Sequence, residues 1–131
     1  MAPQQFTLEE AERLLPNLTD LILRMQERKQ EHERFHMRVL ELEQKMAGNG
    51  HVGEGPLKEA RLGMANAVAE VNSLVQEMEV LGCELKDIDQ GLVDFRSVMG
   101  EEEVYLCWKL GEPSIGWWHS LETGFTGRQP L

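Results

Sequence analysis

Two long stretches of this chain carry apolar side chains at alternating steps of three and four residues, a spacing that places them on one side of a helix. The first series is Leu18, Leu21, Met25, Arg28, His32, Phe35, Val39, Leu42 and Met46. The second is Leu57, Arg61, Met64, Val68, Val71, Val75 and Met78, widened by Ala60, Ala67, Leu74 and Leu81. The pattern is typical of coiled-coil-like helices that bury one stripe against a partner.

A glycine-rich segment separates the two stretches. GNGHVGEGP, residues 48–56, holds four glycines in nine residues and ends in a proline, which suits the first turn of a helix. We therefore predict a helix over residues 7–47, a connector over 48–55 and a second helix over 56–82. Because the two helices have similar lengths, the sequence predicts an antiparallel helical hairpin.

Signals at the helix ends refine this prediction. Thr7 followed by Glu10 forms a capping box, in which each side chain satisfies the other residue's backbone N–H. Pro16 removes a helical hydrogen bond, so we expect the first helix to be kinked near it, between Leu15 and Leu18. Gly82 is suited to the end of the second helix.

Beyond Gly82 the apolar period changes from that of a helix to two, as in strands. The segments LVDF, EVYLCWKL and SIGWWHSL, residues 92–95, 103–110 and 114–121, predict a small antiparallel β-meander within residues 83–131, with an irregular tail. Joining the apolar faces requires pairs such as Trp108–Trp117 and Leu106–His119. The sequence thus predicts an α+β fold, mainly α, in a single domain over residues 1–131.

Charge and composition restrict the partners. The formal net charge is −10, and a surface of this sign repels nucleic acid and anionic membranes. No apolar run approaches the roughly 20 residues that cross a bilayer, and two cysteines without metal-binding spacing indicate a reducing compartment. We therefore expect a cytoplasmic protein. Two helices alone cannot cover so wide an apolar stripe, so a third layer is required, either from the C-terminal sheet or from a second copy of the hairpin. Of these we favour the second copy, and so expect a homodimer.

The motif HERFH, residues 32–36, has the H-E-x-x-H spacing of zinc proteases. In that interpretation His32 and His36 hold a zinc ion and Glu33 activates its water. However, His32 lies in the apolar series, and the facing residues Val68, Val71, Asn72 and Val75 offer no third ligand, so a structural histidine pair bonded to Asn72 is the simpler interpretation. A four-histidine site across a dimer axis and a di-iron site using Glu33 and His36 are further alternatives.

The C-terminal part carries most of the remaining polar chemistry. Asp94 and His119 both alternate with apolar neighbours, so a contact between them would satisfy both, as a structural pair or as a metal or acid/base site. Cys107 is interpreted as sheet packing because no histidine is held beside it by spacing. Asp87 and Asp89 are typical turn residues.

Three segments resemble a known family. FTLEEAERLLPNL near the start, GCELKDIDQGLVDF, and EVYLCWKLGEPSIGWWHSLETGFTGRQPL at the end resemble an uncharacterised bacterial family, domain of unknown function 2203. The resemblance implies no established reaction, and HERFH is not among the motifs that carry it. It directs attention to four candidate ligand-binding residues: Asp94, Glu112, His119 and Arg128. The positions that match the family pattern are Glu84, Lys86, Asp87, Gly91, Asp94, Phe95, Cys107, Trp108, Gly111, Glu112, His119, Gly124, Phe125, Gly127, Arg128 and Pro130.

Three functional hypotheses follow. The first is a non-catalytic homodimeric interaction or scaffold module with an unidentified protein partner and no catalytic residues. The second is a metal-binding protein, with a hydrolase as one form of it, that holds zinc, iron or manganese through His32 and His36 or through Asp94 and His119. The third is a small-ligand pocket on the sheet, with Arg128 holding an anion near His119. A functional site would bring several polar groups to one point, whereas a scaffold would leave them separately satisfied.

Overall fold

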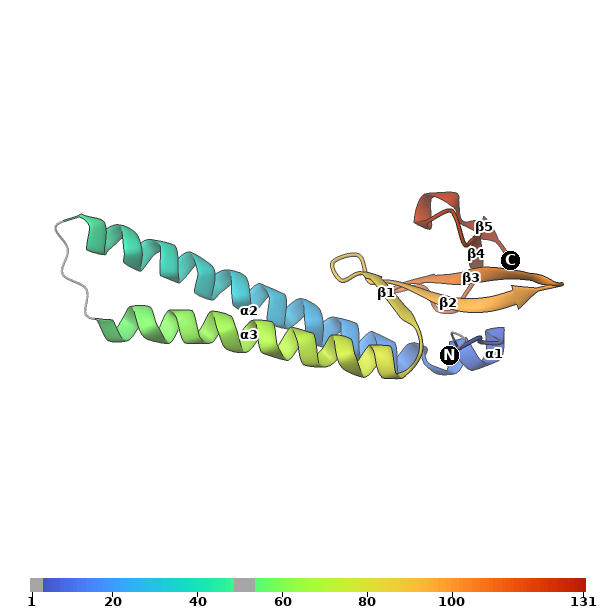
Figure 1. Cartoon of the computed structure of the whole chain (residues 1–131), viewed down its shortest axis with the longest axis horizontal. Helices are drawn as coiled ribbons and strands as arrows, with labels where there is room; N and C mark the ends of the chain where they lie inside the picture. Colours follow the sequence, from blue (N-terminus) through green and yellow to red (C-terminus); the bar gives the residue numbers. More distant parts are fainter. Residues whose placement is uncertain (1–3, 49–53) are drawn as a thin grey trace. The chain divides into compact units, whose positions relative to one another are not determined.

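The computed structural model describes residues 4–48 and 54–131, so most of the predicted glycine-rich connector lies outside the described residues. The chain forms two compact units, Met1–Leu23 with Val75–Leu131, and Arg24–Leu74. The predicted fold class is confirmed: long helices are followed by a small antiparallel sheet (Figure 1). The elements are α1 (Leu8–Arg13), α2 (Leu15–Ala47), α3 (Glu54–Val80), β1 (Glu84–Asp87), β2 (Leu92–Met99), β3 (Glu102–Lys109), β4 (Trp117–Ser120), the 3-10 helix η1 (Phe125–Gly127) and β5 (Gln129–Pro130).

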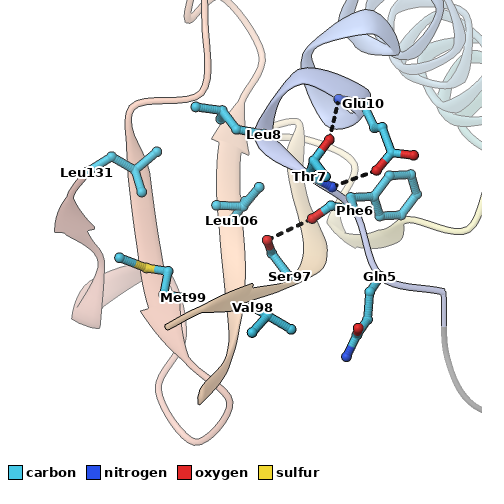
Figure 2. Close-up of a pocket in the computed structure, with 10 residues that line it drawn as sticks. All are labelled: Gln5, Phe6, Thr7, Leu8, Glu10, Ser97, Val98, Met99, Leu106 and Leu131. Atoms are coloured by element: carbon cyan, nitrogen blue, oxygen red, sulfur yellow. Dashed lines mark hydrogen bonds between the residues drawn. The ribbon is translucent and has the colours of Figure 1, made fainter. Parts of the chain in front are cut away.

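The first helical segment begins with the expected capping box. The Glu10 backbone N–H donates to the Thr7 hydroxyl over 3.1 Å, and the Thr7 N–H donates to the Glu10 carboxylate over 2.8 Å (Figure 2). The helix then breaks at Leu14, before Pro16, and not between Leu15 and Leu18 as the sequence predicted. The break comes earlier because Pro16 becomes the second residue of α2, where its missing N–H removes no helical hydrogen bond.

In the unit Arg24–Leu74, α2 and α3 pack against each other as a hairpin. Val39 and Leu42 of α2 and Leu57 and Ala60 of α3 form one buried cluster. On α3 the buried series runs through Ala60, Ala67 and Leu74. All three belong to the predicted stripe, whereas Arg61 and Val68, which were also predicted to lie in it, are exposed.

Close helix packing explains this correction. The aromatic ring of Phe35 lies so near Gly63 that a Cβ at that glycine would be 2.5 Å from a ring carbon. Alanine and glycine on the facing side of α3 let the two backbones approach, whereas valine and arginine would hold them apart. Asn72 is exposed, so it does not supply the buried partner that the sequence suggested for His32.

In the other unit, the five strands form an antiparallel meander in the order β1-β2-β3-β4-β5. Residues of β2 and β3 pair in register from Leu92 opposite Lys109 to Met99 opposite Glu102. Two strands were not predicted: β1, and β5, which pairs with Trp117 and Trp118 of β4 in the tail expected to be irregular. None of the helices in the described ranges is long and apolar enough to cross a membrane.

One face of the sheet is apolar and is covered by the N-terminal segment. Phe6 packs edge-on against Phe95 of β2, with ring centroids 5.4 Å apart. Its backbone N–H donates to the Arg96 carbonyl over 2.7 Å. The buried Ser97 hydroxyl donates to the Phe6 carbonyl over 2.7 Å (Figure 2). These bonds continue the pairing along the edge of β2 past the point where its pairing with β1 stops. They also anchor the segment that leads into α1.

The pairing of β3 with β4 differs by one residue from the prediction. Tyr105 lies opposite His119, and Leu106 lies opposite Trp118. Because side chains alternate between the two faces, this shift moves His119 away from Leu106 and Trp108 and onto the other face. The observed register is the more favourable one, since it places the imidazole beside Asp94 and not unpaired among apolar side chains.

Candidate functional site

Three neighbouring strands each place one side chain of a kind that can bind a metal ion on the second face of the sheet. Asp94 of β2 lies directly opposite Cys107 of β3, and His119 of β4 pairs with a residue two positions before that cysteine. Their exposed fractions are 4%, 1% and 2%, so all three are buried. One ligand atom from each lies within 4.8 Å of the other two. We call this group the Asp–Cys–His cluster.

The hydrogen bonds of His119 define the positions of its protons. Its Nδ1 lies 2.8 Å from the Ser120 carbonyl oxygen, and its Nε2 lies 3.0 Å from Asp94 Oδ2. A carbonyl oxygen only accepts, so Nδ1 carries a proton and donates it to Ser120. Nε2 therefore either shares a second proton with Asp94 or presents a lone pair, the form in which an imidazole binds a metal ion.

Burial controls the acidity of the other two members. It raises the pKa of the Asp94 carboxyl, although hydrogen bonding and charge from His119 act in the opposite direction. Burial, with a smaller contribution from the neighbouring Asp94 carboxylate, raises the pKa of the Cys107 thiol to about 12. At neutral pH without a metal ion, Cys107 is thus a thiol that hydrogen-bonds to Asp94.

This geometry argues against a cysteine nucleophile. Such a cysteine needs a lowered pKa and a histidine nitrogen to take its proton. Here the pKa of Cys107 is raised, and the two nitrogens of His119 bond to Ser120 and Asp94 instead. The arrangement favours metal coordination over covalent catalysis.

The Asp–Cys–His cluster lines a pocket of about 350 Å³. Its lining also includes Lys86 and Tyr105 and the apolar side chains of Leu92, Leu121 and Phe125. The Lys86 ammonium is 3.0 Å from Glu84 Oε1, and this hydrogen bond raises the pKa of Lys86, so the group stays charged. The pocket therefore combines three ligand atoms, one cation and an apolar wall.

Glu112 and Arg128, also candidates from the sequence, form a separate structural contact. Glu112 Oε1 accepts from the Lys109 backbone N–H over 2.7 Å and from Arg128 Nη2 over 2.9 Å. The guanidinium carbon of Arg128 lies 4.8 Å from the Trp117 ring centroid and 4.7 Å from that of Phe125. Arg128 Nη2 also donates to the Cys107 carbonyl, so this residue braces the strand behind the cluster.

His32 and His36 lie in the hairpin unit with their rings stacked, centroids 6.2 Å apart. Both are half-buried, and His36 Nδ1 is 4.0 Å from Glu33. Within residues 4–48 and 54–131, the Asp–Cys–His cluster is the one group of three or more His, Cys, Asp or Glu side chains close enough to share an ion. Within those ranges, no third His, Cys, Asp or Glu side chain lies close enough to share an ion with His32 and His36.

The sequence thus predicted the contact between Asp94 and His119 that the structure shows, but assigned Cys107 to packing. The signal for Cys107 was its position opposite Asp94 once β2 and β3 are paired in register. The register error between β3 and β4 hid it, because that error placed His119 on the other face from the thiol. Asp87 is the last residue of β1, and its carboxylate accepts from the Gln90 N–H of the following turn over 2.9 Å, the kind of bond that the sequence predicted.

The ligand atoms fit a tetrahedral transition-metal ion with small movements. Ligand atoms around bound zinc are about 3.3 to 3.7 Å apart, given bond lengths of about 2.0 Å to nitrogen or oxygen and 2.3 Å to sulfur. The observed 3.0 Å between Nε2 and Oδ2 would widen slightly, and the larger separations in the cluster, up to 4.8 Å, would shorten. Ser120 already orients the imidazole by the backbone bond that ligating histidines commonly make.

Comparisons with known proteins connect the chain to a family but to no described activity. No curated protein matches the chain, and no solved structure matches it. One family model matches residues 4–131, which is nearly the whole chain and includes the Asp–Cys–His cluster. The protein belongs to the family described as Uncharacterized conserved protein (DUF2203).

Proposed function

We propose that this protein binds a divalent transition-metal ion through Asp94, Cys107 and His119. The observation that carries the proposal is the convergence of three buried ligand atoms from three strands within 4.8 Å. Each residue is an ordinary ligand of zinc or iron, and the Ser120 carbonyl directs the Nε2 atom of His119 toward the other two. The adjoining pocket provides an entry path for the ion.

The donor set also restricts the metal. A thiolate with an imidazole and one carboxylate favours zinc or iron, whereas manganese and magnesium prefer oxygen ligands. Three protein ligands leave a fourth position, as in zinc sites that bind exchangeable ligands. Since the site requires Cys107 in its reduced form, and both cysteines are free thiols, we place the protein in a reducing compartment such as the cytoplasm.

The first test is the metal content of purified protein and of two matched cysteine variants. Protein treated with a chelator and then dialysed against zinc should hold one zinc per chain. Cys107→Ser should lose most of this zinc, because serine is a poor zinc ligand at neutral pH. Cys83→Ser is the control: Cys83 is also buried, but its thiol contacts the Met78 carbonyl outside the cluster.

Two results would overturn the proposal. One is wild-type protein that retains no zinc, iron or manganese after dialysis. The other is Cys107→Ser protein that holds as much zinc as wild type. A double variant His32→Ala with His36→Ala should keep its zinc, and loss of the ion in this variant would assign the site to the histidine pair instead.

A second candidate function concerns the hairpin unit. Large apolar side chains remain exposed on both of its helices, among them Met37 of α2 at 56% and Leu62 of α3 at 58%. Exposed apolar side chains on paired helices suit a helical assembly interface. We propose that the hairpin forms a homodimeric interaction module.

A further inference from the structure

The pocket over the Asp–Cys–His cluster has the dimensions and lining of a site for one small molecule. Its volume of about 350 Å³ is near the lower end for small-molecule pockets. Its lining includes the polar groups of the cluster and Lys86 together with the apolar side chains of Leu92, Leu121 and Phe125. This lining suits a molecule with one polar end and an apolar body.

The open coordination position would face this pocket. All three protein ligands come from strands of one sheet, so their donor atoms approach a bound ion from the sheet side. The fourth position then points away from the sheet, where the pocket lies. A ligand in the pocket could therefore coordinate the ion directly.

Charge selects the class of ligand. A divalent ion with the Asp94 carboxylate and the Cys107 thiolate is neutral as a unit. Lys86 adds one positive charge, and its bond to Glu84 uses one of the three N–H donors of the ammonium. Because Asp87 also lines the pocket and offsets Lys86, these charges sum to zero, so a monoanion held by the metal ion and Lys86 is repelled less than a dianion such as phosphate.

We propose, on the basis of the metal site proposed above, that the pocket binds a small organic monocarboxylate. One carboxylate oxygen occupies the fourth position on the metal ion, and the carboxylate lies beside the Lys86 ammonium. The hydrocarbon part packs against Leu92, Leu121 and Phe125. This assigns a ligand class to the cluster and a role in specificity to Lys86.

The test uses the full chain loaded with cobalt(II), whose visible absorption bands report on the ligands of the ion. Benzoate should change these bands saturably, whereas benzamide, which has the same shape and no charge, should not. Lys86→Met should weaken benzoate binding about tenfold, the effect of losing one charge-assisted hydrogen bond. Lys58→Met, at an exposed position on α3, should bind benzoate like wild type.

The outcomes separate this inference from the metal site itself. If cobalt binds but benzoate leaves the bands unchanged, or inorganic phosphate acts at lower concentration than benzoate, the monocarboxylate inference is wrong and the metal site stands. Benzoate binding that is unchanged in Lys86→Met would remove the specificity role and overturn the inference as stated. If cobalt produces no protein-bound spectrum, the proposed metal function fails and this inference fails with it.

Discussion

At His119, both ring nitrogens face oxygen atoms, one in a carbonyl and one in a carboxyl group. A neutral imidazole opposite an ionised Asp94 would leave one nitrogen lone pair pointing at an oxygen lone pair. The Asp94–His119 pair therefore holds one shared proton when no metal is bound. The raised pKa of Asp94 agrees with retention of this proton, since burial disfavours the ionised carboxylate.

This proton, with the thiol proton of Cys107, predicts how metal binding depends on pH. Both protons must leave before the three ligands can coordinate, and the pKa of Cys107 at about 12 keeps its proton in place at neutral pH. Lowering the pH should therefore weaken zinc binding, by about 100-fold per pH unit for two protons. Calorimetry in buffers of different ionisation enthalpy should measure about two protons released per zinc. Release of none would show that the cluster is not the ligand set.

How much of the site the sequence could predict also differs from residue to residue. Alternation with apolar neighbours was sufficient to identify Asp94 and His119, because a half-buried polar side chain needs a partner. Cys107 carries no such signal, since a buried cysteine is ordinary in a sheet. Its role depends on which residues lie opposite it, and strand register is determined by contacts that no single segment contains.

At the scale of the elements, the hairpin shows which part of the predicted α3 stripe is buried. The stripe combined a series through Arg61 and Val68 with a series through Ala60, Ala67 and Leu74, and both have the same spacing, so periodicity alone does not choose between them. The structure buries the second series and exposes Arg61 and Val68. Contact between Phe35 and Gly63 requires this arrangement, because only small side chains permit that approach.

Gly63→Ala tests this packing. Its Cβ would be 2.5 Å from a carbon of the Phe35 ring, so the ring or the helices must shift. Overpacking of this kind costs about 1 to 3 kcal/mol, which exceeds the gain of about 1 kcal/mol that alanine brings to a helix. Urea unfolding followed by circular dichroism should show a less stable protein. Gly55→Ala, where a Cβ meets nothing within 4 Å, should be neutral or stabilising, and equal behaviour of the two variants would contradict the packing account.

At the scale of the whole molecule, the sequence predicted the fold class and the helical hairpin followed by a meander. It missed β1 and β5, because ELKD and QP are short and lack apolar alternation. They are strands because β2 and β4 supply edges to pair with. The single domain and the homodimer stay predictions, while the chain itself forms two compact units.

Mass in solution tests the proposed assembly. Light scattering during size-exclusion chromatography should give about twice the chain mass of 15.0 kDa. Replacing both Met37 and Leu62 by glutamate should shift the protein to the monomer, because charges would replace the exposed apolar side chains. Both positions are exposed in the single chain, so the variant should keep its helix content. A wild-type monomer would remove the dimer proposal and leave the metal site unaffected.

The most direct test of the central claim is X-ray absorption spectroscopy at the zinc edge of the zinc-loaded protein. The cluster predicts one sulfur at about 2.3 Å and nitrogen and oxygen atoms at about 2.0 Å. One sulfur is the expected number because, of the two cysteines, Cys107 alone belongs to the cluster. A first shell without sulfur would contradict the assignment of Cys107, Asp94 and His119 as the metal ligands.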